Sequence, residues 1–261
     1  MTKLVQAFTL KNSAGLKLVG EALRHPEGKG VAVVVHGIGA YSHEPLIQTL
    51  VDAAYEAGLT VVRYDATNSF GESEGRLSDM RFATYADDLH CVMNWVQEQS
   101  WGKAPHTLLG HSLGAATSLD YAAQHPHDVK ALVLVSCVVG GPWWLKAHQE
   151  AIPDTLREWQ KAGVLPKNHP IKKERSGEVS WAYAEDIQQR DFIKTAAPNV
   201  TCPTLLVVGS IDPITPVAAQ QDLQRALKGD TELHVVQGCG HTFKSASQQQ
   251  ELRDTIINWL P

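Results

Sequence analysis

The sequence predicts an α/β protein built on a mostly parallel, doubly wound sheet. Three observations carry this prediction. Apolar runs of strand length recur along the 261-residue chain, amphipathic stretches of helix length separate them, and an antiparallel signal lies at the N-terminus. Continuous apolar strands that alternate with helices are typical of a parallel sheet covered on both faces. We therefore expect right-handed crossovers between successive parallel strands.

The expected elements follow from these patterns in chain order. Strands at Leu4–Leu10 and Leu16–Leu23 flank a turn at 12–15, which predicts an antiparallel pair. The later strands are apolar and β-branched, and we expect them at Val31–Val35, Leu59–Tyr64, His106–Leu109, Ala131–Val135, Leu205–Val208 and Leu233–Val236. Helical patterns lie between them at 44–57, 84–99, 113–124, 216–227 and 245–259.

One stretch interrupts the alternation. Between the strands ending near Ser136 and starting near Thr204 lie over sixty residues, about twice the length that one crossover helix needs. We therefore predict a core of residues 1–137 and 199–261 and an inserted cap of residues 138–198, made of several short helices. The cap is rich in aromatic residues. Most of these are expected to form its own small core, and the candidates for lining a substrate pocket are Trp143, Trp144 and Trp181.

Composition narrows the function. The formal net charge of −5 disfavours a nucleic-acid partner, which would need a concentrated basic surface. The basic run Lys172, Lys173 and Arg175 is interrupted by Glu174 and is expected to be a solvated loop. No apolar run approaches the roughly 20 residues that span a bilayer, and the N-terminus lacks the apolar core of a signal peptide.

The four cysteines are scattered without a C-x-x-C pair, so neither a zinc site nor a disulfide framework is indicated. A reduced, cytoplasmic setting is the expectation. The pair Gly37 and Gly39 follows a strand but lacks the third glycine and the acidic partner of a dinucleotide-binding loop. We expect no metal and no cofactor.

Residues 110–114 read Gly-His-Ser-Leu-Gly and match the pattern G-x-S-x-G. By composition alone such a match arises in roughly one chain of this length in ten, so the pattern by itself is weak. Its context is stronger, because it follows one expected strand directly and opens the next helix, as a nucleophile elbow requires. We predict Ser112 as a nucleophile. The alternative is an ordinary turn with an incidental serine.

A serine nucleophile needs a base, and the base needs an acid that orients it. Asp212 and His241 follow two later strands, in the order Ser, Asp, His that this strand–turn–helix setting favours. Each has another interpretation: Asp212 could initiate a turn and cap the helix after it, and His241 could cap the last helix. The acids Asp222 and Asp230 are poorer candidates because they lie on that helix or beyond it.

Acyl transfer also requires donors for an oxyanion, and backbone N–H groups commonly supply them. One is expected from Leu113, next to the nucleophile. The other is expected from the loop after the third strand, His36-Gly37-Ile38-Gly39, through the main chain of Ile38. The alternative is that this loop is only a flexible strand end.

The chain resembles the α/β-hydrolase superfamily in a series of segments that reads, in order, HGIGAYS, RYDATNSFGESEG, GHSLG, GSIDP and GCGH. Its size, the place of the cap and the GHS elbow resemble small bacterial cinnamoyl or feruloyl esterases and monoacylglycerol lipases. The resemblance covers nearly the whole chain and implies the α/β-hydrolase fold. It also implies a triad of Ser112, Asp212 and His241 with Ile38 as an oxyanion donor.

One segment departs from the family pattern. Those relatives carry a G-H-G-x-S-x-G type sequence after the fourth strand, whereas residues 68–75 read NSFGESEG here. The first glycine and its histidine are absent, so we expect a different wall near the oxyanion loop.

These features predict a serine carboxylesterase that hydrolyses small to medium-sized esters through an acyl-serine intermediate. The aromatic cap favours an aromatic, hydroxycinnamoyl-type acyl group. Thioesterases, C–C bond hydrolases, peptidases and perhydrolases use the same machinery and stay open. A non-catalytic binding protein is disfavoured because all three triad candidates are present. The expected partner is a small-molecule ester, and the sequence predicts no oligomeric state.

Overall fold

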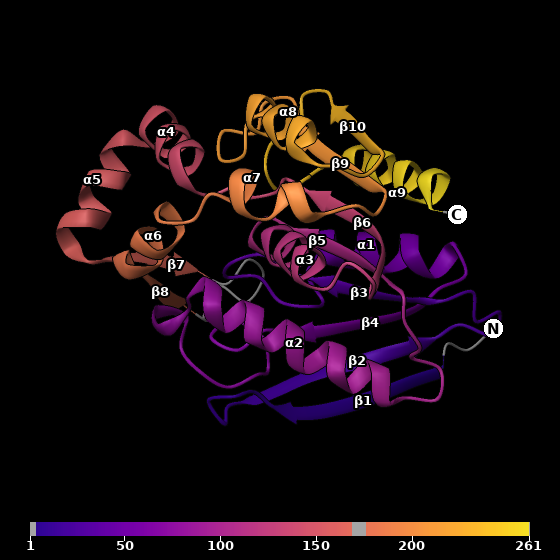
Figure 1. Ribbon diagram of the computed structural model, residues 1–261. Helices are drawn as coiled ribbons and strands as arrows, with labels where there is room; N and C mark the ends of the chain where they lie inside the picture. The colour runs from indigo at the N-terminus through magenta and orange to yellow at the C-terminus, as the bar shows by residue number, and fades with distance from the viewer. Residues whose placement is uncertain (1–3, 169–175, 261) are drawn as a thin grey trace.

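The computed structural model describes residues 4–168 and 176–260 (Figure 1). Its main sheet has eight strands in the order β1-β2-β4-β3-β5-β6-β9-β10. β2 (Lys17–Arg24) pairs antiparallel with both β1 (Leu4–Lys11) and β4 (Thr60–Asp65), and the other neighbouring pairs of this sheet are parallel. The prediction of a mostly parallel sheet with an antiparallel beginning is confirmed.

Apart from the exposed Lys130 of β6, the inner strands are buried along their whole length, which explains why they read as continuous apolar runs. Their bounds agree with the expected ranges to within two residues: β3 (Val31–Val35), β5 (His106–His111), β6 (Val129–Val135) and β9 (Thr204–Gly209). β10 (Thr231–Val236) lies at the edge of the sheet and is only half-buried for most of its length.

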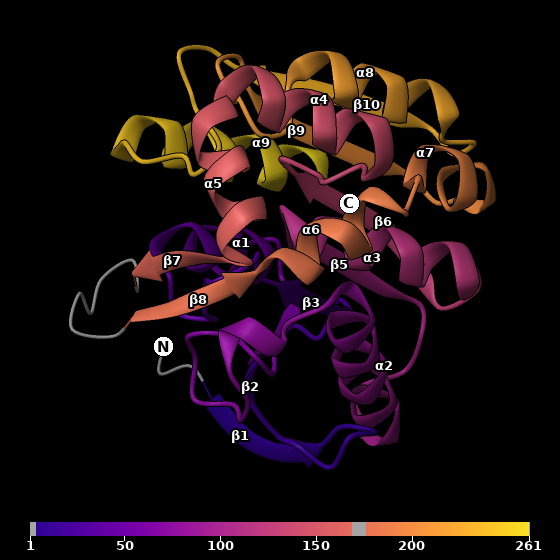
Figure 2. The ribbon, with the colours of Figure 1, turned by 90° about the vertical axis from the view of Figure 1, so that its left-hand side faces the viewer.

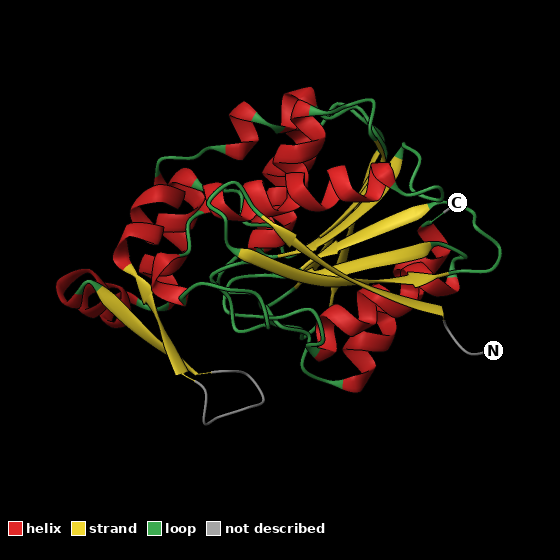
Figure 3. Ribbon diagram, turned by 90° about the horizontal axis from the view of Figure 1, so that it is seen from below, coloured by secondary structure: helices red, strands yellow, loops and turns green. Residues whose placement is uncertain are grey.

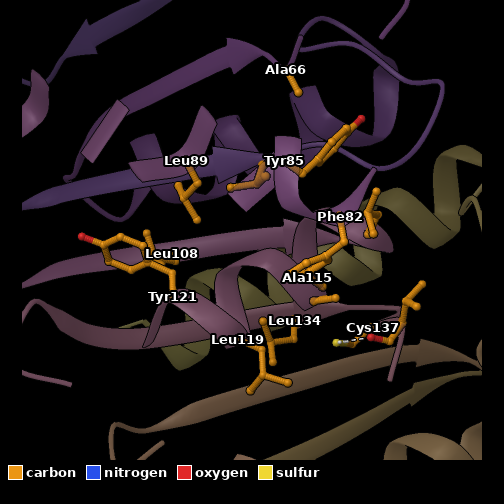
Figure 4. Close-up of a cluster of buried hydrophobic side chains, with 14 of the residues drawn as sticks. Ala66, Phe82, Tyr85, Leu89, Leu108, Ala115, Leu119, Tyr121, Leu134 and Cys137 are labelled. Atoms are coloured by element: carbon orange, nitrogen blue, oxygen red, sulfur yellow. Dashed lines mark hydrogen bonds between the residues drawn. The ribbon is translucent and has the colours of Figure 1, made fainter. Parts of the chain in front are cut away.

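Helices cover both faces of the sheet (Figure 3). One buried apolar cluster joins one face to α1 (Pro45–Glu56) and α9 (Ala246–Trp259). A second cluster joins the opposite face to α2 (Phe82–Glu98), α3 (Leu113–Gln124) and α8 (Val217–Ala226). Figure 4 shows part of it, with Phe82 and Tyr85 of α2 near Ala115 of α3. Each of these helices lies where the sequence predicts one.

The first part of the segment between β6 and β9 lies at the end of the sheet toward which the parallel strands point, and its last part packs against α3 and α8 (Figures 1 and 2). It contains α4 (Gly141–Ala151), α5 (Pro153–Ala162), a hairpin of β7 (Val164–Asn168) and β8 (Ser176–Ser180), then α6 (Trp181–Gln188), α7 (Phe192–Thr195) and the 3-10 turn η2 (Ala197–Asn199). The basic run at 172–175 lies outside the described residues.

The sequence predicts only short helices in this segment, and the β7–β8 hairpin differs from that prediction. β7 contains Pro166 and β8 reads SGEVS, so neither shows the apolar alternation by which a strand is recognised. The hairpin packs on the core instead: Gly177 lies against Phe70 and against Leu77 of the 3-10 turn η1 (Leu77–Asp79). We keep residues 138–198 as the proposed cap.

A buried polar network ties the N-terminal hairpin to α2. The carboxylate of Asp88 accepts hydrogen bonds from Asn12 Nδ2 at 3.0 Å, Thr67 N at 2.6 Å and Thr67 Oγ1 at 2.8 Å. Burial raises the pKa of Asp88 to about 6, although these three donors oppose the rise. Desolvation of the charge therefore outweighs the hydrogen bonds.

This raised pKa predicts a pH-dependent stability. A carboxyl group whose pKa is higher in the folded than in the unfolded protein stabilises the fold below the unfolded value, and that stabilisation is lost as the pH rises through about 6. The free energy of unfolding of wild type, measured by urea denaturation, should fall by about 1 to 2 kcal/mol relative to Asp88→Asn between pH 5 and pH 7.5.

Asp87→Asn, which alters the half-buried neighbour that binds Ser13, is the matched control and should keep most of the wild-type dependence on pH, because the charge of Asp87 is the smallest of the causes that shift the pKa of Asp88. Parallel pH profiles for wild type and Asp88→Asn would refute the assignment to Asp88.

Candidate active site

Ser112 occupies a strained turn between β5 and α3. Its φ of 56° and ψ of −116° lie outside the regions that non-glycine residues ordinarily adopt. The Ser112 carbonyl accepts the N–H groups of Ala115 and Ala116 at 3.1 and 3.2 Å, so the first turn of the helix holds the strained residue in place. This geometry presents the serine at the carboxyl end of β5.

The glycines of the motif are required by close backbone packing. A Cβ on Gly110 would lie 2.4 Å from the carbonyl oxygen of Gly114, and a Cβ on Gly114 would lie 2.3 Å from that of Val35. Real Cβ atoms do not approach backbone atoms so closely. The two glycines of the G-x-S-x-G pattern are therefore needed because α3 packs closely over β5 and β3.

The structure brings the three predicted triad residues together. His241 Nε2 lies 3.0 Å from Ser112 Oγ, and His241 Nδ1 lies 2.9 Å from Asp212 Oδ2. Both distances are within the hydrogen-bonding range that a nucleophile, a base and an orienting acid require. The side chain of His241 is 19% exposed and that of Asp212 is fully buried. The group of three residues is therefore open to solvent at His241, whereas the Asp212 carboxylate is closed off from solvent.

The Asp212 carboxylate is held by more than the histidine. Its Oδ1 accepts the N–H groups of Ile214 and Thr215, and its Oδ2 accepts the hydroxyls of Ser136 at 2.8 Å and Thr215 at 2.7 Å. Burial alone would raise the pKa of Asp212. The hydrogen bond and charge of His241, together with the bonds from Thr215, lower it well below the usual range.

The bonds to Ile214 and Thr215 show that Asp212 also organises the turn that follows it. It does not cap α8, whose N-cap is Pro216, and the N-cap of α9 is Ser245 rather than His241. Of the alternatives that the sequence left open, the turn interpretation of Asp212 is correct alongside its contact with His241.

The loop of residues 36–39 runs beside the serine. A Cβ on Gly37 would lie 3.1 Å from Ser112 Cβ and 3.2 Å from His111 Nδ1, so this position also needs glycine. Among residues 4–168 and 176–260, neither the Ile38 N–H nor the Leu113 N–H has a hydrogen-bond acceptor. Two backbone donors near a nucleophile can receive a developing oxyanion.

His111, the variable residue of the motif, links the elbow to the loop that carries His241. Its Nε2–H donates to the backbone carbonyl of His241 at 3.0 Å, and the two rings lie 5.0 Å apart. Burial and the nearby charge of His241 lower the pKa of His111 to about 3. The ring therefore stays neutral near pH 7 and positions His241 without placing a second cation beside it.

The cap tryptophans occupy different places. Trp143 and Trp144 line a small hollow with Thr215, next to the buried acid. Trp143 Nε1 donates to Asp222 Oδ2 at 2.8 Å, which anchors the indole to α8. Trp181 packs edge-on against Trp159, 5.4 Å between ring centroids, and does not line that hollow.

Lys167 of β7 lies over the loop of residues 36–39. A Cβ on Gly39 would lie 2.4 Å from Lys167 Cε, so the lysine stem lies directly over this glycine. Burial lowers the pKa of Lys167, and the charge of Glu44 opposes the shift. The same environment raises the pKa of Glu44 through burial, opposed by Lys167. The cap therefore adds a charged side chain to the wall beside Ile38.

Sequence reasoning missed several residues that support the site. Ser136 follows β6 as Asp212 follows β9, so its position at a strand end could have indicated it. Thr215 stands three residues after Asp212, where a hydroxyl commonly binds the acid of a turn, so turn chemistry could have indicated it. His111 lay inside the motif. Nothing in the local pattern around Tyr85, whose hydroxyl donates to the Gly37 carbonyl at 3.1 Å, points to this site.

In the part of the chain that the structure describes, no group of three or more His, Cys, Asp or Glu residues is arranged to hold a metal ion. A search of the same residues found no helix long and apolar enough to cross a membrane.

A family model of hydrolases, described as serine aminopeptidase, S33, matches residues 26–245. The chain belongs to this family. RutD of Klebsiella pneumoniae (strain 342), whose name proposes a carbamate hydrolase, is 29% identical over 243 residues, covering 82% of this chain and 85% of RutD. The monoacylglycerol lipase of Mycolicibacterium smegmatis (strain ATCC 700084 / mc(2)155) is 25% identical over 260 residues, covering 89% and 88%.

The solved structures agree on the fold. Est1E from Butyrivibrio proteoclasticus with ferulic acid bound superposes with a TM-score of 0.78 at 17% identity, covering 97% of both chains. At this identity the likeness shows the fold alone. The hydrolase described here thus has the α/β-hydrolase fold and belongs to that superfamily, as the sequence motifs implied.

The packing of the elbow yields a stability prediction. Gly110→Ala should lower the free energy of unfolding by at least about 2 kcal/mol, because its methyl group meets the backbone of residues 114 and 115. Gly240→Ala is the matched control near His241: a Cβ there would meet nothing within 4 Å, and the change should stay within about 0.5 kcal/mol. Equal effects in urea denaturation would contradict the packing argument.

Proposed function

We propose that this protein is a serine carboxylesterase that hydrolyses small to medium-sized carboxylic esters through an acyl-serine intermediate. The observation that carries the proposal is the continuous chain of hydrogen bonds from Ser112 Oγ through both nitrogens of His241 to the buried Asp212 carboxylate. Membership of a hydrolase family supports it.

In acylation, Ser112 Oγ attacks the ester carbonyl carbon while His241 Nε2 takes the hydroxyl proton. The carbonyl oxygen becomes an oxyanion, which the N–H groups of Ile38 and Leu113 would receive. When the intermediate collapses, the carbon–oxygen bond to the alcohol breaks and the protonated His241 gives its proton to the leaving oxygen. Asp212 holds the Nδ1–H tautomer and stabilises the imidazolium.

In deacylation, a water molecule attacks the acyl-serine and His241 takes its proton. The second tetrahedral intermediate uses the same two backbone donors. Its collapse releases the carboxylic acid and returns the proton to Ser112 Oγ. The low pKa of Asp212 keeps this residue ionised through both steps at neutral pH.

The wall of the site supports a substrate class. Trp143 and Trp144 of the proposed cap line the hollow beside Thr215, and their aromatic surface favours an apolar or aromatic acyl group. Ferulic acid in the structure of Est1E is consistent with an aromatic acyl product in this fold. We therefore propose hydroxycinnamoyl esters as candidate substrates. Methyl ferulate should be hydrolysed with a higher kcat/KM than methyl butyrate.

A second candidate is carbamate hydrolysis, favoured by the similarity to RutD. The same nucleophile, base and donors would serve it, because a carbamate differs in the group attached to the carbonyl carbon and not in the attack. An aryl carbamate tested beside the ester separates the two candidates: turnover of the carbamate at the ester rate favours the second, whereas slow carbamoylation of Ser112 without turnover favours the first.

Ser112→Ala should abolish hydrolysis of a p-nitrophenyl ester series from C2 to C12 and labelling by a fluorophosphonate probe, because both need the Oγ nucleophile. Removing a triad member typically costs on the order of 10⁶-fold in kcat. Ser118→Ala is the control. This serine lies on the same helix, and its hydroxyl donates to a helix carbonyl, so activity and labelling should persist.

Ester turnover that survives in purified Ser112→Ala would refute the proposed mechanism. Labelled wild type without turnover of any ester would move the assignment to thioesters, peptides, carbamates or C–C bonds.

Asp212→Asn should lower kcat by about 10³- to 10⁴-fold, because the amide is nearly the same size but cannot stabilise the imidazolium. Asp230→Asn, an exposed residue near the start of β10, should leave kcat within about twofold of wild type. Initial-rate kinetics with p-nitrophenyl butyrate measure both. Similar kcat values for the two variants would remove Asp212 from the mechanism.

A further inference from the structure

Three donors converge on one carbonyl oxygen in the oxyanion loop. The Gly37 carbonyl accepts the hydroxyl of Tyr85 at 3.1 Å, the ring N–H of His36 at 2.8 Å and the backbone N–H of Ala40 at 3.3 Å. Tyr85 and His36 are buried, and their rings meet edge-on, 5.8 Å apart. Three donors to one loop carbonyl hold this C=O group in a fixed orientation.

The proton positions follow from the neighbouring bonds. The Ala66 N–H donates to His36 Nε2 at 2.9 Å, so Nε2 carries no proton and Nδ1 is the donor to Gly37. Burial lowers the pKa of His36, opposed by the charge of Asp65. Burial also raises the pKa of Tyr85, which keeps its hydroxyl protonated as a donor.

The Gly37 carbonyl and the Ile38 N–H belong to the same peptide unit. The unit is planar and trans, so its N–H points opposite to its C=O. Fixing the carbonyl toward α2 therefore fixes the N–H toward the other side. Gly37 lies against Ser112 Cβ, and the Ile38 N–H has no acceptor among the described residues.

We propose that Tyr85 is a positioning residue for the oxyanion hole: its hydroxyl holds the 37–38 peptide so that the Ile38 N–H is aimed at the developing oxyanion. The inference rests on the proposed function, in which Ile38 is one of the two donors. Tyr85 touches no reacting atom and acts through this peptide.

The chain offers a matched control. Tyr64 of β4 is, like Tyr85, a buried tyrosine, but its hydroxyl has no hydrogen-bond partner among the described residues. Tyr85→Phe and Tyr64→Phe delete the same atom from the same kind of environment. Only the first removes a bond to the oxyanion loop.

Tyr85→Phe should lower kcat for p-nitrophenyl butyrate by about 5- to 50-fold with KM within about twofold. This is a fraction of the roughly 10²- to 10³-fold effect of losing one oxyanion donor outright, because the peptide is loosened and not removed. The inhibition constant of an alkyl trifluoromethyl ketone, which forms an oxyanion on Ser112, should rise by a similar factor. Tyr64→Phe should change neither quantity by more than about twofold.

A structural role alone would lower the melting temperature and the active fraction without raising the inhibition constant measured on the folded enzyme. The proposal is overturned if Tyr85→Phe keeps wild-type kcat, or loses kcat while still binding the ketone as wild type does. A Tyr64→Phe variant that behaves like Tyr85→Phe would also overturn it. Failure of the proposed function itself is distinguishable, because wild type would then neither turn over esters nor bind the ketone through Ser112.

Discussion

The site depends on how closely the backbone of the elbow approaches its neighbours. The turn at Ser112 brings α3 against the carbonyl groups that end β3, and Gly37 against Ser112 itself, with no room for a Cβ at residues 37, 110 or 114. This contact sets the distance between Ser112, the proposed nucleophile, and the loop that carries the proposed Ile38 donor. The positions of His241 and Asp212 follow, because both lie at the same edge of the same parallel sheet.

The second constraint is electrostatic. Besides His241, the buried histidines His36 and His111 lie at the site, and their pKa values are lowered mainly by burial. Each uses a ring N–H to hold a backbone carbonyl, that of Gly37 or that of His241. They position the proposed machinery while uncharged, and of the three rings only that of His241 is hydrogen-bonded to the Asp212 carboxylate. A cation at either position would compete with the imidazolium that forms during the reaction.

The sequence predicted most of the fold because the information was local. Continuous apolar runs marked the buried strands, and helical periodicity marked the covering helices. The three triad residues could be placed because each follows a strand, and parallel strands end at one edge. The hairpin β7–β8 could not be predicted, because Pro166 and a polar β8 give no strand pattern and its contacts with Phe70 and Leu77 are distant in the sequence. Tyr85 was missed for the same reason: its role depends on a bond across 48 positions of the chain.

The residues of the proposed machinery all come from the core, whereas the proposed cap contributes only the wall. Ser136, Thr215, His111 and Tyr85 join the triad through elements of the main sheet and its helices. The cap supplies Trp143, Trp144 and Lys167, which contact the site without entering the hydrogen-bond chain. Such a division allows the wall to change while the reaction stays the same. It accounts for relatives of this fold whose names and ligands range from a carbamate to a monoacylglycerol and ferulic acid. In this chain the proposed cap places the stem of Lys167 over Gly39, so this side chain forms part of that wall beside the proposed donor Ile38.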